Sequence, residues 1–142
     1  MQTVVLFATK SGATAECAAL LAQNLNCAAY DLTKPLPEIE TYDTIIMGSG
    51  VRMGKIYKPA LGFIRRNLNL LLARRTALYF CNAYPDTFKK AVEKNIPAKL
   101  VKQAVCIQSF GGRPPLSSAP LSSWLNQSKL ALFLKTIQDI SQ

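Results

Sequence analysis

The sequence has no histidine among its 142 residues. Without an imidazole side chain, Ser–His and Cys–His catalysis and His-ligated metal sites are excluded. Cysteine is present, but its spacing matches neither a C-x-x-C motif nor a metal site, so we expect free thiols that are mostly buried. The four cysteines are Cys17, Cys27, Cys81 and Cys106. We therefore predict no metal site and no catalytic side chain.

Acidic residues are also scarce. The 17 Lys and Arg residues outnumber the 8 Asp and Glu residues, and the formal net charge is +9. Such a balance indicates an anionic partner: nucleic acid, an acidic protein, a membrane surface or a charged substrate. The basic residues are dispersed, carry no interleaved aromatic residues and form no recognition helix, which argues against nucleic acid.

Long hydrophobic runs are absent. No apolar run approaches the length of a membrane-spanning helix, and residues 1–8 are too short for a signal peptide and lack its basic start. We therefore expect a cytoplasmic protein with at most peripheral membrane contact. The aliphatic content is high and only 18% of the residues are charged, which argues against disorder. The length predicts a single domain over residues 1–142.

Apolar runs typical of buried strands alternate with segments whose apolar residues recur at helical spacing. The expected strands are residues 4–8, 28–32, 44–48, 76–81 and 104–109, and the expected helices are residues 17–25, 61–72, 87–95 and 124–140. This alternation predicts an α/β fold with a parallel sheet and right-handed crossovers.

The segment 9–14 connects the first expected strand to the first expected helix. A helix start presents unpaired backbone N–H groups and the positive end of the helix dipole, which together attract anions. Thr9, Ser11 and Thr14 add three hydroxyls, and Gly12 lets the backbone close around a phosphate. An ordinary capped turn is the alternative, although it needs only one Ser or Thr.

The pattern T-x-S-G-x-T after an N-terminal strand resembles the phosphate loop of flavodoxins, which holds the 5′-phosphate of FMN. The resemblance implies that residues of this loop bind the cofactor: Thr9, Lys10, Ser11, Gly12, Ala13 and Thr14. It also implies a flavodoxin-like, doubly wound, five-stranded parallel sheet of order 2-1-3-4-5, with helices on both faces. Ligands of this fold lie beyond the carboxyl ends of the strands.

A second glycine-rich segment follows the third expected strand. Gly48, Gly50 and Gly54 are spaced G-x-G-x-x-x-G, which is neither a dinucleotide fingerprint nor a Walker A loop. We interpret the segment as a loop whose glycines let the backbone approach a flat ligand, with Met53 and Tyr57 contacting its ring. A glycine-rich turn that binds nothing is the alternative.

The run S-G-V-R-M-G-K-I-Y looks like the ring-binding loop of a flavodoxin-like subgroup, the menaquinone-dependent protoporphyrinogen oxidases. The resemblance implies that residues of this loop line the isoalloxazine ring: Ser49, Gly50, Val51, Arg52, Met53 and Gly54. Asn82, Ala83 and Tyr84 occupy the place of the second ring loop, with Tyr84 able to stack on the flavin. Gly111, in the glycine- and arginine-containing turn after the fifth strand, is also implied to bind the cofactor.

Two departures from these families affect the expected function. Only the compact stretch 114–123 stands where the oxidases carry an extended insertion, which argues against porphyrinogen oxidation. Ordinary flavodoxins surround the flavin with acidic residues, whereas this chain places Arg52, Lys55, Lys58 and Arg113 near the expected ring edge. Cations there favour the anionic reduced flavin and raise its potential.

The sequence therefore predicts an FMN-binding, flavodoxin-like electron-transfer protein in which the flavin supplies the redox chemistry. A flavin-dependent oxidase or quinone reductase of the protoporphyrinogen-oxidase type is the first alternative. A flavodoxin-like module that has lost FMN and binds an anionic partner is the second. The expected partner is a redox protein or a quinone-like or anionic acceptor, and not nucleic acid.

Overall fold

The computed structural model describes residues 2–84, 87–113 and 118–140. Its strands are β1 (Thr3–Ala8), β2 (Ala28–Asp31), β3 (Thr44–Arg52), β4 (Lys55–Ile56), β5 (Arg75–Cys81) and β6 (Cys106–Ser109). Its helices are α1 (Ala13–Leu25), α2 (Lys58–Arg66), α3 (Leu68–Leu72), α4 (Phe88–Asn95), α5 (Ala98–Gln103), α6 (Leu121–Trp124) and α7 (Gln127–Ile140), and a short 3-10 helix spans Ile39–Thr41. The expected α/β class is confirmed.

Five strands form a parallel sheet of order β2-β1-β3-β5-β6, and β4 pairs antiparallel with β3. The predicted five strands in order 2-1-3-4-5 are thus corrected to six strands, because a short hairpin strand follows the third one. Met53 and Gly54, between β3 and β4, have φ angles of 54° and 74°. Positive φ at both turn residues is the pattern of a type I′ turn, which reverses a strand in two residues.

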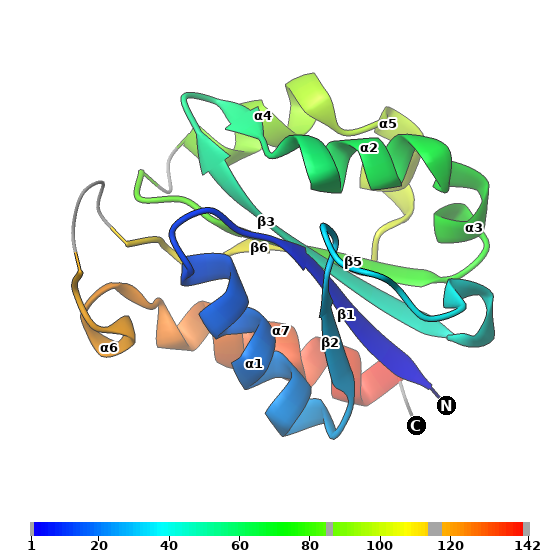
Figure 1. Cartoon of the computed structure of the whole chain (residues 1–142), viewed down its shortest axis with the longest axis horizontal. Coiled ribbons are helices and arrows are strands. Elements are labelled where there is room, and N and C mark those ends of the chain that lie inside the picture. Colours follow the sequence, from blue (N-terminus) through cyan, green and yellow to red (C-terminus); the bar gives the residue numbers. More distant parts are fainter. Residues whose placement is uncertain (1, 85–86, 114–117, 141–142) are drawn as a thin grey trace.

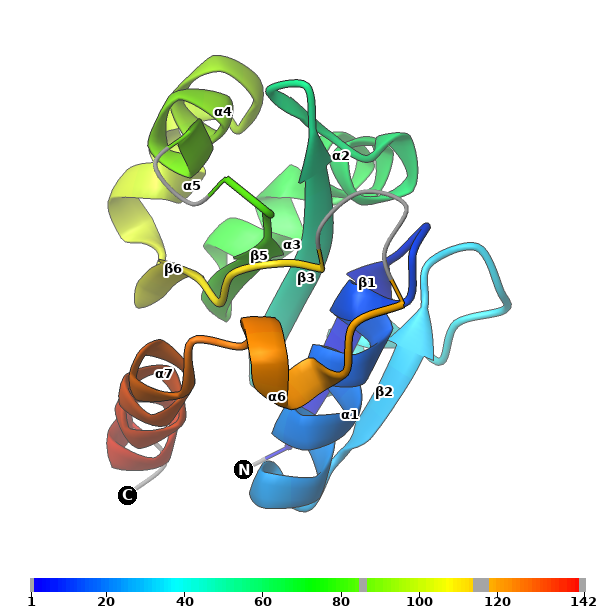
Figure 2. The ribbon, with the colours of Figure 1, turned by 90° about the vertical axis from the view of Figure 1, so that its left-hand side faces the viewer.

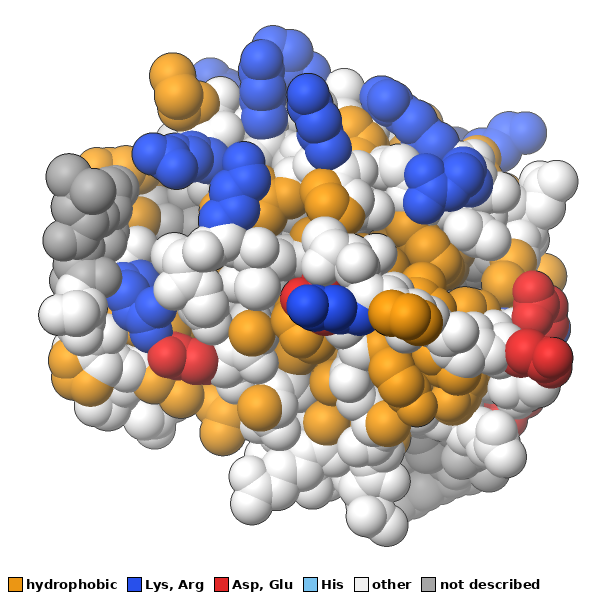
Figure 3. Space-filling view, in the orientation of Figure 1, with side chains coloured by type: hydrophobic (Ala, Val, Ile, Leu, Met, Phe, Trp, Pro, Cys, Tyr) orange, Lys and Arg blue, Asp and Glu red, His pale blue; other side chains and the backbone are white. Residues whose placement is uncertain are grey.

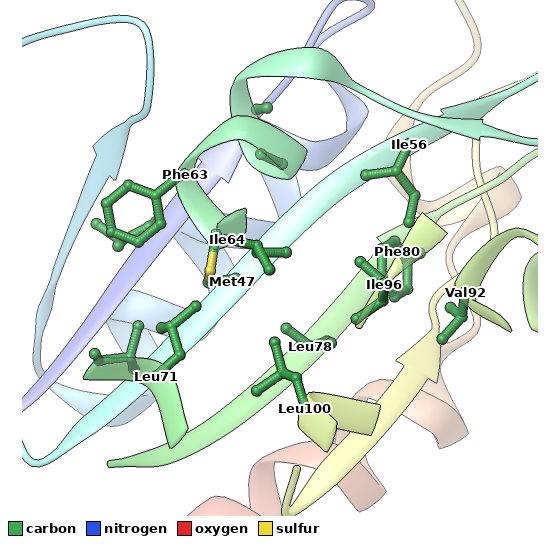
Figure 4. Close-up of a cluster of buried hydrophobic side chains, with 14 of the residues drawn as sticks. Met47, Ile56, Phe63, Ile64, Leu71, Leu78, Phe80, Val92, Ile96 and Leu100 are labelled. Carbon is green, nitrogen blue, oxygen red and sulfur yellow. The ribbon is translucent and has the colours of Figure 1, made fainter. Parts of the chain in front are cut away.

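Successive residues of the buried strands point to opposite faces of the sheet, so the chain builds two cores. In β1, Val4 packs in one core and Val5 in the other. Helices α2 to α5 cover the first face, and α1 and α7 cover the second (Figure 1). In the first core, Leu78 of β5 lies among side chains that include Ile64 of α2 and Leu100 of α5 (Figure 4).

The parallel register brings the carboxyl ends of the strands to one edge of the sheet. Ala8 of β1 pairs with Ser49 of β3, and Gly50 of β3 pairs with Cys81 of β5. The loops that follow β1, β3, β5 and β6 therefore meet at this edge. All the predicted binding residues belong to these loops or to the strand and helix ends beside them.

Several element boundaries differ from those expected. The helix predicted over 61–72 divides at Asn67, whose φ of −119° and ψ of 24° are not helical. Helix α5 and helix α6 were not predicted. The last helix begins at Gln127 rather than at Trp124, because the Asn126 side chain accepts the Lys129 N–H at 3.1 Å and caps it there. None of the helices in the described ranges has the length and hydrophobicity to cross a bilayer.

Candidate functional site

The loop between β1 and α1 closes through Gly12. This residue has a φ of 90°, a left-handed conformation that strains other residues, and its N–H donates to the Thr9 hydroxyl oxygen at 3.0 Å. The first helical bond runs from the Glu16 N–H to the Gly12 carbonyl at 2.9 Å. The N–H groups of Ala13, Thr14 and Ala15 therefore have no acceptor within the helix.

The three hydroxyls of this loop face different surroundings. Ser11 is exposed and Thr9 is half-buried, whereas Thr14 is 2% exposed. The Thr14 carbonyl accepts the Tyr79 hydroxyl at 3.0 Å, and the Thr14 side chain hydrogen-bonds Cys81. Thr14 thus contributes a backbone N–H to the loop, and its side chain joins α1 to β5.

Arg113 clamps the same loop. Its guanidinium donates to the Ser11 carbonyl at 2.5 Å and forms an ion pair with Glu16 at 2.6 Å. The Arg113 side chain is only 12% exposed. The sequence led us to expect Arg113 near the ring edge, whereas in the structure its guanidinium contacts Ser11 and Glu16. The chain after β6 crosses the carboxyl edge toward α1 (Figure 2), which brings Arg113 to the first loop instead.

The second predicted loop is a hairpin rather than an open loop, because β3 continues through Arg52. Ser49 and Val51 are buried, and the Ser49 hydroxyl donates to the Gly50 carbonyl at 2.8 Å while accepting the Tyr57 N–H at 3.2 Å. A Cβ atom on Gly50 would lie 2.4 Å from the Tyr57 ring. Gly50 therefore accommodates an aromatic ring of the protein itself.

Tyr57 joins the first two loops. The Lys10 ammonium lies 4.7 Å from the centre of the Tyr57 ring, a cation–π contact. Burial raises the pKa of the Tyr57 hydroxyl, and the nearby Arg52 charge opposes this rise. From the sequence we expected Tyr57 only to contact the ring of a flat ligand. Its place just after a glycine-rich run was the signal that could have indicated its packing between the first two loops.

The tip of the hairpin projects into solvent. Arg52, Met53, Gly54 and Lys55 are all exposed, and Met53 is 92% exposed. The Asn95 side chain of α4 donates to the Gly54 carbonyl at 3.2 Å and holds the tip beside that helix. The tip therefore presents the apolar side chain of Met53 between Arg52 and Lys55, at a position held by α4.

The third loop is shaped by Asn82, which is buried. Its side-chain amide donates to the Tyr84 carbonyl and to the Thr87 hydroxyl, both at 2.8 Å, and its oxygen accepts the Tyr84 N–H at 3.1 Å. These bonds leave the Tyr84 side chain 66% exposed. Asn82 and the half-buried Ala83 thus support the loop, whereas Tyr84 is presented to solvent.

The turn after β6 packs closely on its neighbours. Gly111 has a φ of 81°, and a Cβ there would lie 2.6 Å from the Trp124 carbonyl. A Cβ on Gly112 would lie 2.7 Å from the Ala83 nitrogen. Both glycines allow backbone segments to approach one another, and the Asn82 N–H donates to the Gly111 carbonyl at 3.0 Å. The Gly111 carbonyl therefore holds the third loop in place through Asn82.

A hollow lies at the other edge of the sheet. It measures about 500 Å³ and is lined by Glu40, Asp43, Leu72, Ala73, Arg74, Arg75 and Gln103. The Arg74 guanidinium there donates to the carbonyls of Tyr42 and Glu40, at 2.9 and 3.0 Å. This arginine is held by backbone acceptors, whereas the start of α1, with N–H groups that lack helical acceptors, lies at the opposite, carboxyl edge of β1. We therefore place the functional site at the carboxyl edge.

The four thiols in the described ranges are free, with Cys17 and Cys81 buried and Cys27 and Cys106 half-buried. The Cys81 and Cys17 sulfurs are 3.6 Å apart. The hydrogen bond with Cys17 and then burial raise the pKa of the Cys81 thiol well above its ordinary value. No group of three or more His, Cys, Asp and Glu residues in the described part of the chain is arranged to hold a metal ion.

A doubly wound sheet whose parallel strands follow the order β2-β1-β3-β5-β6 has the arrangement of the flavodoxin-like class of α/β proteins. Residues 4–119 match the Flavodoxin domain family, and the chain belongs to that family. No match was found among curated protein sequences.

Three solved structures illustrate the likeness. Oxidised Flavodoxin 1 from Bacillus cereus is 21% identical with a TM-score of 0.70, and the match covers 98% of both chains. A flavodoxin from the domain Archaea is 13% identical with a TM-score of 0.64 over both complete chains. A flavoprotein from Lactobacillus acidophilus NCFM in complex with FMN is 16% identical with a TM-score of 0.60, covering 76% of this chain and 92% of that one. None of these matches singles out the protoporphyrinogen oxidases.

Proposed function

We propose that this chain binds FMN at the carboxyl edge of its sheet and transfers electrons. The observation that carries the proposal is the first loop. Gly12 turns the backbone into α1 directly after the exposed residues Lys10 and Ser11, and the N–H groups of the first helical turn have no acceptor within the helix. These donors fit a phosphate dianion, which a helix start stabilises through its dipole and its unpaired N–H groups.

The ring of the flavin would lie toward the second and third loops. Met53 and Tyr84 are two of the three large hydrophobic side chains that are exposed in the described residues. Tyr84 projects from the third loop, where a planar ring would cover it, and Met53 projects from the hairpin tip, where it would border the edge of the ring and keep its outer side in solvent. When bound, FMN would supply the electron-accepting and electron-donating chemistry, while this chain orients it and sets the charge around it.

Electron carriage is favoured over porphyrinogen oxidation by the short connection after β6. Oxidation of a porphyrinogen or reduction of a quinone of the protoporphyrinogen-oxidase type remains the alternative that the S-G-V-R-M-G-K-I-Y run supports. A binding module without FMN is the other alternative.

The proposal is tested by titrating the purified chain with FMN and with riboflavin, following flavin fluorescence and the visible spectrum. We expect FMN to bind at least about tenfold more tightly, because riboflavin lacks the phosphate. Equal affinities would remove the first loop from the site, and rejection of both flavins would favour the FMN-free module. Turnover of a quinone or porphyrinogen by the loaded protein would favour the oxidase.

A further inference from the structure

Charge is divided unequally between two parts of the chain. Residues 52–102 contain 12 of the 17 Lys and Arg residues and only 2 of the 8 Asp and Glu residues. Their net charge is therefore +10, whereas the remaining residues together carry −1. Because residues 52–102 form the hairpin tip, β5 and the layer from α2 to α5, the excess charge belongs to one side of the sheet.

Ten of these cations are exposed side chains of the hairpin, α2, α4 and α5, and we call them the basic face. They are Arg52, Lys55, Lys58, Arg65, Arg66, Lys89, Lys90, Lys94, Lys99 and Lys102. Lys and Arg side chains gather along this side of the molecule, above α2 and α4 in the view of Figure 3. The ion pair found within the described ranges, Arg113–Glu16, lies elsewhere, so none of these ten cations forms an ion pair with a carboxylate of the described residues.

The basic face reaches the proposed flavin site through the hairpin tip. The bond from Asn95 to the Gly54 carbonyl fixes the tip against α4, so Arg52 and Lys55 continue the row of cations that α4 carries. Met53 stands between them and is 92% exposed. A flexible apolar side chain surrounded by charges is typical of the centre and rim of a transient protein interface.

We propose that the basic face docks a small electron-transfer protein with an acidic surface, and that Met53 is the apolar centre of the contact. This inference rests on the proposed function. Opposite charges steer such partners together quickly and let them separate, as repeated electron delivery requires. A membrane fits less well, since Leu132, the remaining exposed large hydrophobic residue, lies on α7 in the other layer. Nucleic acid fits less well because the ten side chains are not interleaved with exposed aromatic rings.

The test measures electron transfer from a reduced acidic [2Fe–2S] ferredoxin to the FMN-loaded full chain by stopped flow. The triple variant Lys89→Glu/Lys90→Glu/Lys94→Glu reverses charges on exposed positions of α4, none of which is among the residues proposed to bind the flavin. We expect its second-order rate constant at low salt to fall at least about tenfold. The matched variant Lys129→Glu/Lys135→Glu, on exposed positions of α7, should change the rate less than about twofold. Met53→Ala should slow the reaction with little change in its salt dependence.

Binding of the oxidised ferredoxin to the flavin-free chain separates the two proposals. If FMN does not bind but the ferredoxin binds in a way that the α4 variant abolishes, the proposed function fails and the docking surface stands. Equal rates for the α4 and α7 variants would overturn the docking surface while leaving FMN binding intact. Preferential binding of phosphatidylglycerol vesicles or of a DNA duplex, with ferredoxin unbound, would also overturn it.

Discussion

The first loop and the hairpin both contain glycine, but their glycines do different things. Gly12 has a φ of 90°, and a Cβ there would meet Arg113 at an ordinary 3.6 Å. Gly48 and Gly50 instead lie in β3, and a Cβ on them would lie 2.0 Å from the Tyr79 ring and 2.4 Å from the Tyr57 ring. Gly12 is needed for its backbone conformation, whereas Gly48 and Gly50 are needed for space. A glycine-rich run therefore does not by itself indicate contact with a ligand.

The largest effect is expected at Gly48. Valine there would force the buried Tyr79 ring aside, and Tyr79 stacks on Phe110 with ring centres 5.2 Å apart. We expect Gly48→Val to cost about 3 kcal/mol or more of unfolding free energy, measured by chemical denaturation with circular dichroism.

Gly54→Ala is the matched control for this prediction. Its Cβ would enter open space, but its φ of 74° is unfavourable for alanine. We expect a cost of about 1–2 kcal/mol, from the backbone alone. A Gly48→Val protein as stable as the control would show that the Tyr79 ring can move aside without loss of stability. Glycines needed for space would then not differ from glycines needed for a positive φ.

The next largest effect is expected at Gly50. Substitution there tests whether this glycine makes space for a side chain or allows contact with a ligand. Gly50→Ala should cost about 1–3 kcal/mol, because the added Cβ overlaps the Tyr57 ring. Combining it with Tyr57→Ala should cost less than the sum of the two single changes, because the overlap is then absent. Additive costs in a double-mutant cycle would place the role of Gly50 elsewhere. FMN titration of the same variants would show whether the ring also depends on Gly50.

At Gly12 we expect a smaller effect on stability, and an effect on binding that is selective for FMN over riboflavin. Gly12→Val should disfavour the left-handed turn and misdirect the N–H groups at the start of α1. We expect FMN affinity to fall about tenfold, or about 1.4 kcal/mol, while riboflavin affinity stays nearly unchanged. Titration of both flavins measures this. A parallel loss for the two would mean that the change acts through the fold and not through the phosphate.

The contrast between the two loops also shows which parts of the candidate site could be predicted from the sequence. The first loop was predictable because its pattern is local: a buried strand, hydroxyls with a glycine, and then a helix. The roles of Gly48 and of Arg113 were not, because their partners lie far away along the chain, at Tyr79 and at Ser11 and Glu16. Strand β4 was missed because its turn begins with methionine, whereas two-residue hairpin turns are usually recognised by Asn-Gly or Asp-Gly.

The smallest effect is expected from the charge at the hairpin tip. In a partly buried site, Arg52 would raise the potential of bound FMN substantially, as the sequence led us to expect. The side chain is exposed, however, and an exposed charge contributes only a few tenths of a kcal/mol. Because each ~1.4 kcal/mol corresponds to ~59 mV for one electron, we expect Arg52→Gln to lower the potential by about 10–30 mV.

Because Arg52 is exposed to solvent, salt should screen its effect on the potential of bound FMN. At about 1 M ionic strength the Debye length is about 3 Å, so the effect of Arg52→Gln should nearly vanish in a potentiometric titration. Lys129→Gln, on exposed α7, provides the control and should leave the potential unchanged at every salt concentration. A shift that persists at high salt would mean that the bound flavin shields Arg52 from water. The hairpin tip would then be part of the flavin site, as the first loop is. The two loops would differ only in the roles of their glycines.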